Sequence, residues 1–216
     1  MSSSNLCRWS GAAGIVAGVL LVLATAVHPS KETPAVILEQ ELRLIAGHWL
    51  YTFFHGFFLL GLVGLYTAQS ERAGRLGLVS FLMVFFGGLF FVESNEYGFI
   101  APVLAAGAPA MLDAINLYPP VAAMNALVIV GWFVGMILFG IVTIRVGYFS
   151  RRAGVCLALG SLLYVVGGAL GQLVNEALWS VAIFAAVLLA LGLGSAGYAL
   201  WSSVARPQLK TAAVAT

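Results

Sequence analysis

Long apolar segments alternate with short polar or proline-containing segments along this chain. Most of the apolar segments reach about 20 residues, the length that an α-helix needs to cross the hydrocarbon core of a bilayer. Backbone groups in lipid must satisfy their own hydrogen bonds, so these segments predict helices, and the short alternating segments of barrel strands are absent. The pattern therefore predicts an all-α polytopic membrane bundle, one domain over residues 1–216. Its six transmembrane helices are predicted at residues 11–27, 48–68, 75–98, 121–144, 153–174 and 177–204.

The composition supports a lipid environment. Of the residues, 62% are hydrophobic and 8% are charged, and the mean hydropathy is +1.03. Soluble domains carry about 25% charged residues, so membrane lipid is the expected surrounding partner. The net charge of +2 and the lack of a separate basic cluster argue against a nucleic-acid partner. Cys7 and Cys156 form no CxxC pair, so no disulfide or zinc framework is predicted.

The lysine and arginine residues predict the orientation of the helices. Eight of them fall on one side of the predicted bundle, and two, Lys31 and Arg43, fall on the other. Because cytoplasmic loops carry the basic excess, we predict a multi-pass cell-membrane protein with both termini in the cytoplasm. The eight residues are Arg8, Arg72, Arg75, Arg145, Arg151, Arg152, Arg206 and Lys210.

The first apolar segment has an alternative interpretation. Arg8, the apolar stretch after it and Ala24-Thr25-Ala26 resemble a secretory signal peptide with a small-residue cleavage site. Cleavage of residues 1–26 would leave five helices and an N-terminus outside the cell.

Two of the outer connections are predicted to contain short amphipathic surface helices. Thr33-Pro34 is typical of a helix start, and residues 35–46 then mix apolar and charged positions up to Gly47. Four prolines, at positions 102, 109, 119 and 120, interrupt the apolar run after the third predicted helix. A second surface helix is predicted there, over residues 108–115.

Residues 72–96 align without gaps to residues 152–176, which indicates an internal repeat of three parallel helical hairpins. The competing explanation is coincidence, because apolar helices are built from few residue types.

Gly14/Gly18 and Gly131/Gly135 have GxxxG spacing, which we assign to packing within the chain rather than to dimerisation. Protein partners and a homo-oligomer both remain open.

Polar residues gather near the predicted outer ends of five helices. Ionisable groups within a membrane are costly and usually face the bundle interior or a wet cavity. His55 and Glu93 are therefore the candidate catalytic residues, and we expect them to face each other. Further ligand-binding candidates are His48, Glu96, Asn125, Gln172, Asn175 and Glu176, and the metal-binding candidates are His28, His48, His55, Glu93 and Glu96.

Each candidate also has a structural explanation. His28 and His48 suit an interfacial aromatic belt, Asn95 and Asn175 suit helix N-caps, and Asn125 and Gln172 suit interhelical hydrogen bonds. For His55 and Glu93 the structural explanation is a buried polar pair that fixes packing.

No motif of a known catalytic class accompanies these residues, so the sequence does not decide whether the protein is an enzyme. HExxH, GxSxG and Walker-type loops are all absent. Histidine with carboxylate suits a divalent metal, whereas a haem is disfavoured because His48 and His55 share one helix face. Three hypotheses follow: an outer pocket for a small ligand or divalent metal, a non-catalytic membrane subunit or assembly factor, and a small proton-coupled transporter.

Overall fold

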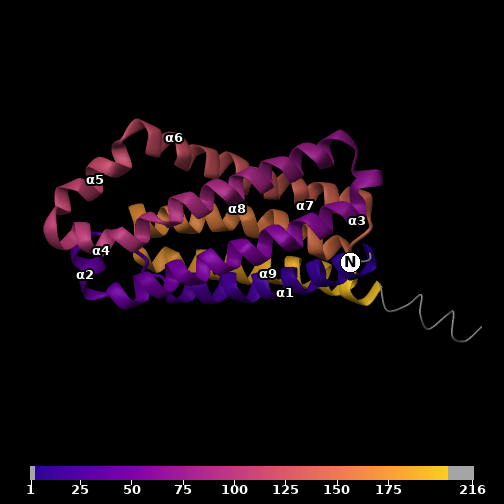
Figure 1. Cartoon of the computed structure of the whole chain (residues 1–216), viewed down its shortest axis with the longest axis horizontal. Coiled ribbons are helices and arrows are strands. Elements are labelled where there is room, and N and C mark those ends of the chain that lie inside the picture. The colour runs from indigo at the N-terminus through magenta and orange to yellow at the C-terminus, as the bar shows by residue number, and fades with distance from the viewer. Residues whose placement is uncertain (1–2, 204–216) are drawn as a thin grey trace, which may run out of the picture.

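The computed structural model describes residues 3–203 as a bundle of long helices that run roughly parallel to one axis (Figure 1). Within this part of the chain no strand is present. The elements in order are α1 (Ser3–Val27), α2 (Pro34–Glu39), α3 (Glu41–Asn95), α4 (Tyr97–Gly107), α5 (Pro109–Leu117), α6 (Pro119–Val128), the π-helical segment η1 (Ile129–Val134), α7 (Gly135–Val146), α8 (Arg151–Leu173), the 3-10 turn η2 (Glu176–Leu178) and α9 (Trp179–Ser203).

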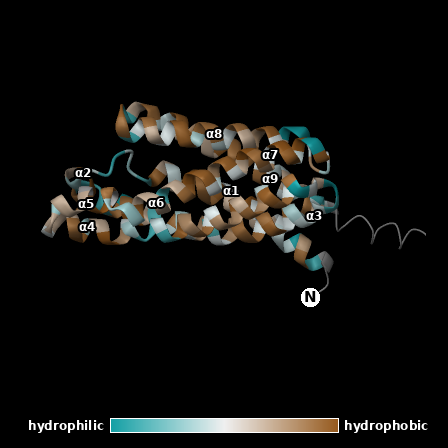
Figure 2. Ribbon diagram, turned by 90° about the horizontal axis from the view of Figure 1, so that it is seen from above, coloured by the Kyte–Doolittle hydropathy of each residue, from teal (hydrophilic) through white to brown (hydrophobic). Residues whose placement is uncertain are grey.

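Five stretches of the described chain are helical, long and apolar enough to cross a membrane. They are Asn5–Val27, Glu41–Gly107, Pro119–Val146, Arg151–Leu173 and Glu176–Ser202. Apolar residues dominate the middle of the bundle, and polar residues gather toward its two ends (Figure 2). This distribution is the one expected of a multi-pass membrane protein.

The helix α3 reverses direction at Gly74. A straight α-helix of its 55 residues would be about 82 Å long. Gly74 instead has φ 58° and ψ −160°, a conformation that favours glycine. The two arms of α3, before and after Gly74, lie side by side and run in opposite directions (Figure 1). Tyr66 stacks on Phe81 with ring centroids 4.3 Å apart, close to the reversal. The predicted helices 48–68 and 75–98 are therefore the two arms of α3, and the loop between them is reduced to one glycine.

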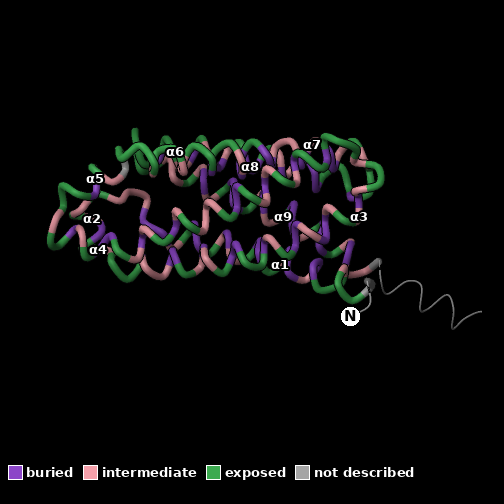
Figure 3. The backbone as a smooth tube through the Cα atoms, turned by 45° about the horizontal axis from the view of Figure 1, so that its top comes forward, coloured by how far each residue is buried: buried purple, intermediate pink, exposed green. Residues whose placement is uncertain are grey.

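Small residues allow the helices to approach closely, and the buried residues face the inside of the bundle (Figure 3). A Cβ atom on Gly61 would lie 2.9 Å from the Cα atom of Gly14, and one on Gly131 would lie 2.8 Å from that of Gly87. The GxxxG glycines thus pack within the chain, as the sequence predicts.

One end of the bundle carries a small cap. There α2, α4 and α5 surround a separate apolar core of Ile37, Leu44, Ala101, Ala105 and Leu112. The α4 helix was not predicted, because the prolines were taken to break the run, yet Pro102 lies inside it. The predicted helix 108–115 corresponds to α5.

The predicted surface helix 35–46 begins as expected but is too long. The helix α2 ends at Glu39, and residues 41–46 already belong to α3. Gly47 does not end a helix: a Cβ atom there would lie 3.1 Å from atoms of His28, so this glycine makes room for a neighbouring chain segment.

Candidate functional site

A cavity of about 690 Å³ opens near the capped end of the bundle. Its walls come from the α1–α2 connection, the two arms of α3, the start of α4, α6 with η1, α8 and the start of α9. Pockets of 300–1,000 Å³ commonly hold one small ligand. The residues that carry the argument below all line it: His28, Lys31, Glu32, His48, Tyr51, Asn95, Tyr164 and Trp179.

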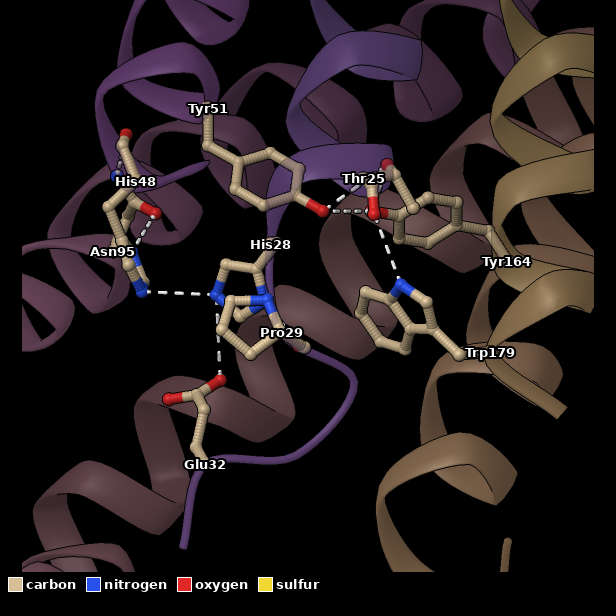
Figure 4. A network of polar contacts seen from close by, with 9 residues as sticks. All are labelled: Thr25, His28, Pro29, Glu32, His48, Tyr51, Asn95, Tyr164 and Trp179. Carbon is tan, nitrogen blue, oxygen red and sulfur yellow. Dashed lines mark hydrogen bonds and ion pairs between the residues drawn. The ribbon is translucent and has the colours of Figure 1, made fainter. Parts of the chain in front are cut away.

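Two histidines meet at this cavity (Figure 4). His28 follows the last residue of α1, and His48 lies two turns into α3. Their side chains are 5% and 7% exposed. The Nε2 atom of His28 lies 3.2 Å from the Nε2 atom of His48, and the two rings meet edge to face at 4.9 Å.

The hydrogen bonds of the other ring nitrogens fix the tautomer of both histidines. His28 Nδ1 lies 2.8 Å from the carbonyl oxygen of Pro29, which can only accept, so this nitrogen carries the proton. His48 Nδ1 lies 2.7 Å from Asn95 Oδ1. Asn95 Nδ2 donates to the His48 carbonyl at 3.0 Å and to Thr52 at 2.8 Å, which fixes the amide and makes its oxygen the acceptor. In the neutral form, both Nε2 atoms therefore present lone pairs.

Glu32 completes the group. Its Oε1 atom lies 3.7 Å from His28 Nε2, and one ligand atom from each of His28, Glu32 and His48 lies within 4.8 Å of the others. With all three groups deprotonated, three electron-pair donors converge on one small volume, and a shared proton, a water molecule that donates hydrogen bonds or a cation would relieve their mutual repulsion.

Burial sets the protonation of the two groups in the α1–α2 connection. Desolvation lowers the pKa of His28 from 6.5 to about 4, and the charge of Arg43 adds to this shift, against the hydrogen bond to Pro29. Burial raises the pKa of Glu32, and His48 opposes that shift. At neutral pH the His28 imidazole is therefore neutral, with its lone pair available.

A cluster of hydroxyl groups forms the adjoining floor of the cavity. The hydroxyls of Tyr51 and Tyr164 are 2.7 Å apart. Both contact the Thr25 hydroxyl, at 3.2 Å and 3.0 Å. Trp179 donates from Nε1 to the Thr25 carbonyl at 3.1 Å, and its ring stacks on His28 with centroids 6.0 Å apart. The Trp179 ring therefore packs on the His28 ring, and His28 remains part of the cavity lining.

The structure does not bring His55 and Glu93 together. His55 is fully buried, with its Nδ1 atom 2.7 Å from the Tyr51 carbonyl and its ring centroid 4.5 Å from that of Phe91. Glu93 is exposed. Residues four apart share a helix face, so Phe91 and Asn95 both point toward the first arm of α3, and Glu93, midway between them, points away. The expected contact between His55 and Glu93 is wrong.

The remaining candidates divide into two groups. Asn125 and Gln172 line the cavity with the two histidines. Glu96, Asn175 and Glu176 are exposed. Asn175 had been considered both as a ligand-binding residue and as a helix N-cap. Its side chain caps η2 by accepting a hydrogen bond from Ala177 N at 2.9 Å. Glu176 lies 3.5 Å from the Ser30 hydroxyl.

Sequence reasoning missed Glu32, Tyr51, Tyr164, Thr25 and Trp179, and it assigned Asn95 to a cap rather than to His48. Two glycines carried a usable signal. A Cβ atom on Gly47 would press on His28, and one on Gly98 would overlap three ring atoms of His48. Glycines at these positions are what a close approach of two histidine rings requires.

Comparison of the chain with protein-family models, with curated proteins and with solved structures finds no match. Function must therefore be argued from the chemistry of the site.

Proposed function

We propose that this protein is a multi-pass membrane protein that binds a divalent metal, with zinc as the favoured ion, through His28, Glu32 and His48 at a dead-end cavity. One observation carries the proposal: two histidines whose Nδ1 protons are committed elsewhere direct their Nε2 lone pairs at each other across 3.2 Å. A metal ion turns that repulsion into two bonds.

The spacing of the donor atoms suits zinc. Two nitrogen ligands at about 2.0–2.1 Å from a tetrahedral zinc ion lie about 3.3 Å apart, close to the 3.2 Å between the Nε2 atoms. The bonds from Nδ1 to Pro29 and Asn95 are of the kind that orient metal-bound histidines. Glu32 lies slightly farther away, at 3.7 Å from His28 Nε2, on a connection outside the long helices.

Three protein ligands would leave a tetrahedral ion one further position, and the cavity beside the three residues could supply its ligand. An ion held in this way acts as a Lewis acid or activates a bound water when such chemistry is required. Tyr51 and Tyr164 can donate a hydrogen bond from the floor of the same cavity. The arrangement favours a ligand-binding or catalytic role over that of a subunit without a site.

The floor of the cavity argues against the transporter hypothesis. Beyond the tyrosine hydroxyls the core is filled by Phe54, Phe58 and Trp132, each at most 2% exposed. A proton or ion pathway would need polar groups that continue toward the opposite end. A pocket that ends within the bundle is the better description.

The first test of the metal site is its content of metal. Protein purified in detergent without chelators is expected to hold about one divalent ion per chain. Removing it should lower the melting temperature, because a ligand at 100 times its Kd contributes about 2.7 kcal/mol, or roughly 5–10 °C for a chain of this size. Elemental analysis and thermal unfolding before and after chelation measure both.

The exposed carboxylate of Glu96 provides the control for this test. A Glu96→Gln protein should keep the metal and the response to chelation. The proposal is contradicted by protein that contains no divalent ion and whose melting temperature does not change when zinc is added.

For the arrangement in the membrane, we propose six crossings, with α3 crossing twice. Each arm of α3 exceeds the roughly 20 residues that a crossing needs, and Gly74 reverses the chain between them. In the described part, the start of α1, the reversal of α3 and the α7–α8 connection then share one end, and α2 lies at the other (Figure 1). The first end carries Arg8, Arg72, Arg75, Arg145, Arg151 and Arg152, whereas Lys31 and Arg43 lie close to α2 in the chain. Arg206 and Lys210 lie outside the described residues. This bias supports an outer position for the proposed metal site and cytoplasmic termini.

Cysteine labelling tests this orientation. In a protein without Cys7 and Cys156, a cysteine introduced at the exposed position Glu39 should react with a membrane-impermeant maleimide in intact cells. One introduced at Tyr148, at the opposite end of the bundle and 46% exposed, should react only after permeabilisation. The reverse pattern would invert the orientation, and equal labelling of both from outside would contradict the spanning arrangement. A mature chain that begins near Val27 would instead support the signal peptide.

The three-hairpin repeat is also part of the proposal. Gly87 and Gly167 occupy equivalent positions in the two matching segments, and each packs against the backbone of a later spanning segment, Gly87 against η1 and Gly167 against α9. Asn95 and Asn175, by contrast, have different partners. Packing thus supports a common hairpin, while the polar ends of its copies have diverged.

A further inference from the structure

The cavity beside the metal ligands has two unlike halves. His28, Glu32 and His48 form a polar end with Lys31. Apolar side chains come from two other elements, Val128 and Ile129 from α6 and η1 and Val165 and Ala169 from α8, with Asn125 and Gln172 one turn away on these elements. A ligand that fills both halves must itself have a polar end and an apolar body.

The apolar half lies between α6 and α8, which separate toward the capped end of the bundle (Figure 1). The helix α7 packs on α8, but α6 packs on α3. The π-helical segment Ile129–Val134 joins α6 to α7 at the point of divergence. Ile129 and Leu173, which line this half, are 49% and 84% exposed, so the cavity is accessible from the side of the bundle, where acyl chains would lie.

The polar half favours an anion once metal is bound. Two neutral imidazoles and one carboxylate leave a divalent ion with one net positive charge, and Lys31 adds another. Among the described residues that line the cavity, Glu32 is the single acidic residue, and its carboxylate already lies 3.7 Å from His28 Nε2.

We propose that this cavity binds a single-chain amphiphile with an anionic oxygen headgroup, taken from the bilayer between α6 and α8. The inference rests on the proposed metal site. The headgroup oxygen takes the open position on the metal beside Lys31, and the chain lies against the apolar side chains of the other half. A volume of about 690 Å³ suits one such molecule.

Gly168 and Gly56 offer a matched pair of variants. Gly168 lines the cavity, and a Cβ atom there meets nothing within 4 Å. Gly168→Leu should therefore fill the space of the chain without a backbone clash. Gly56 is exposed on α3, away from the cavity, and a Cβ atom there also meets nothing within 4 Å. Gly56→Leu makes the same change to a helix without touching the cavity.

The test uses zinc-loaded protein in phosphatidylcholine nanodiscs and radiolabelled palmitate as the probe, with empty nanodiscs as the background. Wild type and Gly56→Leu should bind about one palmitate per chain with saturation, and Gly168→Leu should bind at least tenfold more weakly. Lys31→Gln should weaken binding severalfold. Hexadecanol should compete at least tenfold less well than palmitate, and acetate should not compete at the same concentration.

The outcomes separate this inference from the proposed function, because zinc content is measured in the same samples. Zinc-loaded wild type that binds no palmitate, or Gly168→Leu that binds as well as wild type, overturns the amphiphile and leaves the metal site standing. Equal competition by acetate points to a free anion as the ligand, and equal competition by hexadecanol removes the role of the headgroup charge; either result overturns the inference. Protein that binds palmitate equally with and without zinc overturns the placement of the headgroup on the metal.

Discussion

A His48→Ala protein is expected to lose stoichiometric zinc binding while remaining helical and inserted in the membrane. The substitution removes one of the three proposed ligands and leaves His28 Nε2 with no nitrogen opposite it. Changes to groups that merely orient a ligand cost about 10–100-fold in metal affinity, so loss of a direct ligand should exceed about 100-fold. Competition against a chromophoric chelator in detergent measures the affinity, and circular dichroism checks the helix content.

Two asparagines give this experiment an internal comparison. Asn95 accepts a hydrogen bond from His48 Nδ1 at 2.7 Å, whereas Asn175, at the aligned position of the proposed repeat, caps η2. Asn95→Ala should weaken zinc binding about 10–100-fold, and Asn175→Ala should leave it unchanged. If His48→Ala binds zinc like wild type, the cluster is not the metal site. If the two asparagine variants have the same zinc affinity, the orientation of the His48 ring by Asn95 does not contribute to metal binding.

The class of fold was accessible from the sequence because lipid leaves few choices. Runs of apolar residues such as 153–174 must be helical wherever the backbone meets acyl chains, and α8 (Arg151–Leu173) follows that prediction closely. Two local departures from the predicted pattern have different causes. Gly47 was taken as a helix end, yet it lies inside α3 against His28. The π-helical segment after Val128 leaves no mark in the hydrophobic pattern.

The site was harder to predict because it depends on which helices are neighbours. Depth along a helix placed His28, His48, Asn125 and Gln172 correctly at one end, and all four line the cavity. The predicted contact between His55 and Glu93 was wrong because the depth of a residue along a helix does not give the direction of its side chain around the helix axis. Glu32 was overlooked because it lies in a connection, where an acidic residue is ordinary, and only the fold brings its carboxylate to within 3.7 Å of His28 Nε2.

The direction of the His48 ring also underlies the second large effect that we expect, which is at Gly98. A Cβ atom on this residue would overlap Nε2, Cε1 and Cδ2 of His48. The ring has little freedom to move, because Asn95 holds Nδ1 and the rings of His28 and Phe99 lie 4.9 Å and 5.9 Å away. Gly98→Ala must therefore turn the Nε2 lone pair away from His28 or shift α4.

Either response should lower zinc affinity at least as much as Asn95→Ala does, about 10–100-fold, with a loss of stability of about 1–3 kcal/mol from overpacking. Gly107→Ala is the matched control, because Gly107 lies in the same helix and a Cβ atom there meets nothing within 4 Å. That variant should keep the zinc affinity of wild type and the same or slightly higher stability, since alanine is the better helix former. Equal zinc affinity in both glycine variants would show that the ring orientation enforced by Gly98 is not what the metal requires. A loss of zinc affinity in Gly98→Ala alone would instead show that metal binding requires a residue without a side chain at this position of α4.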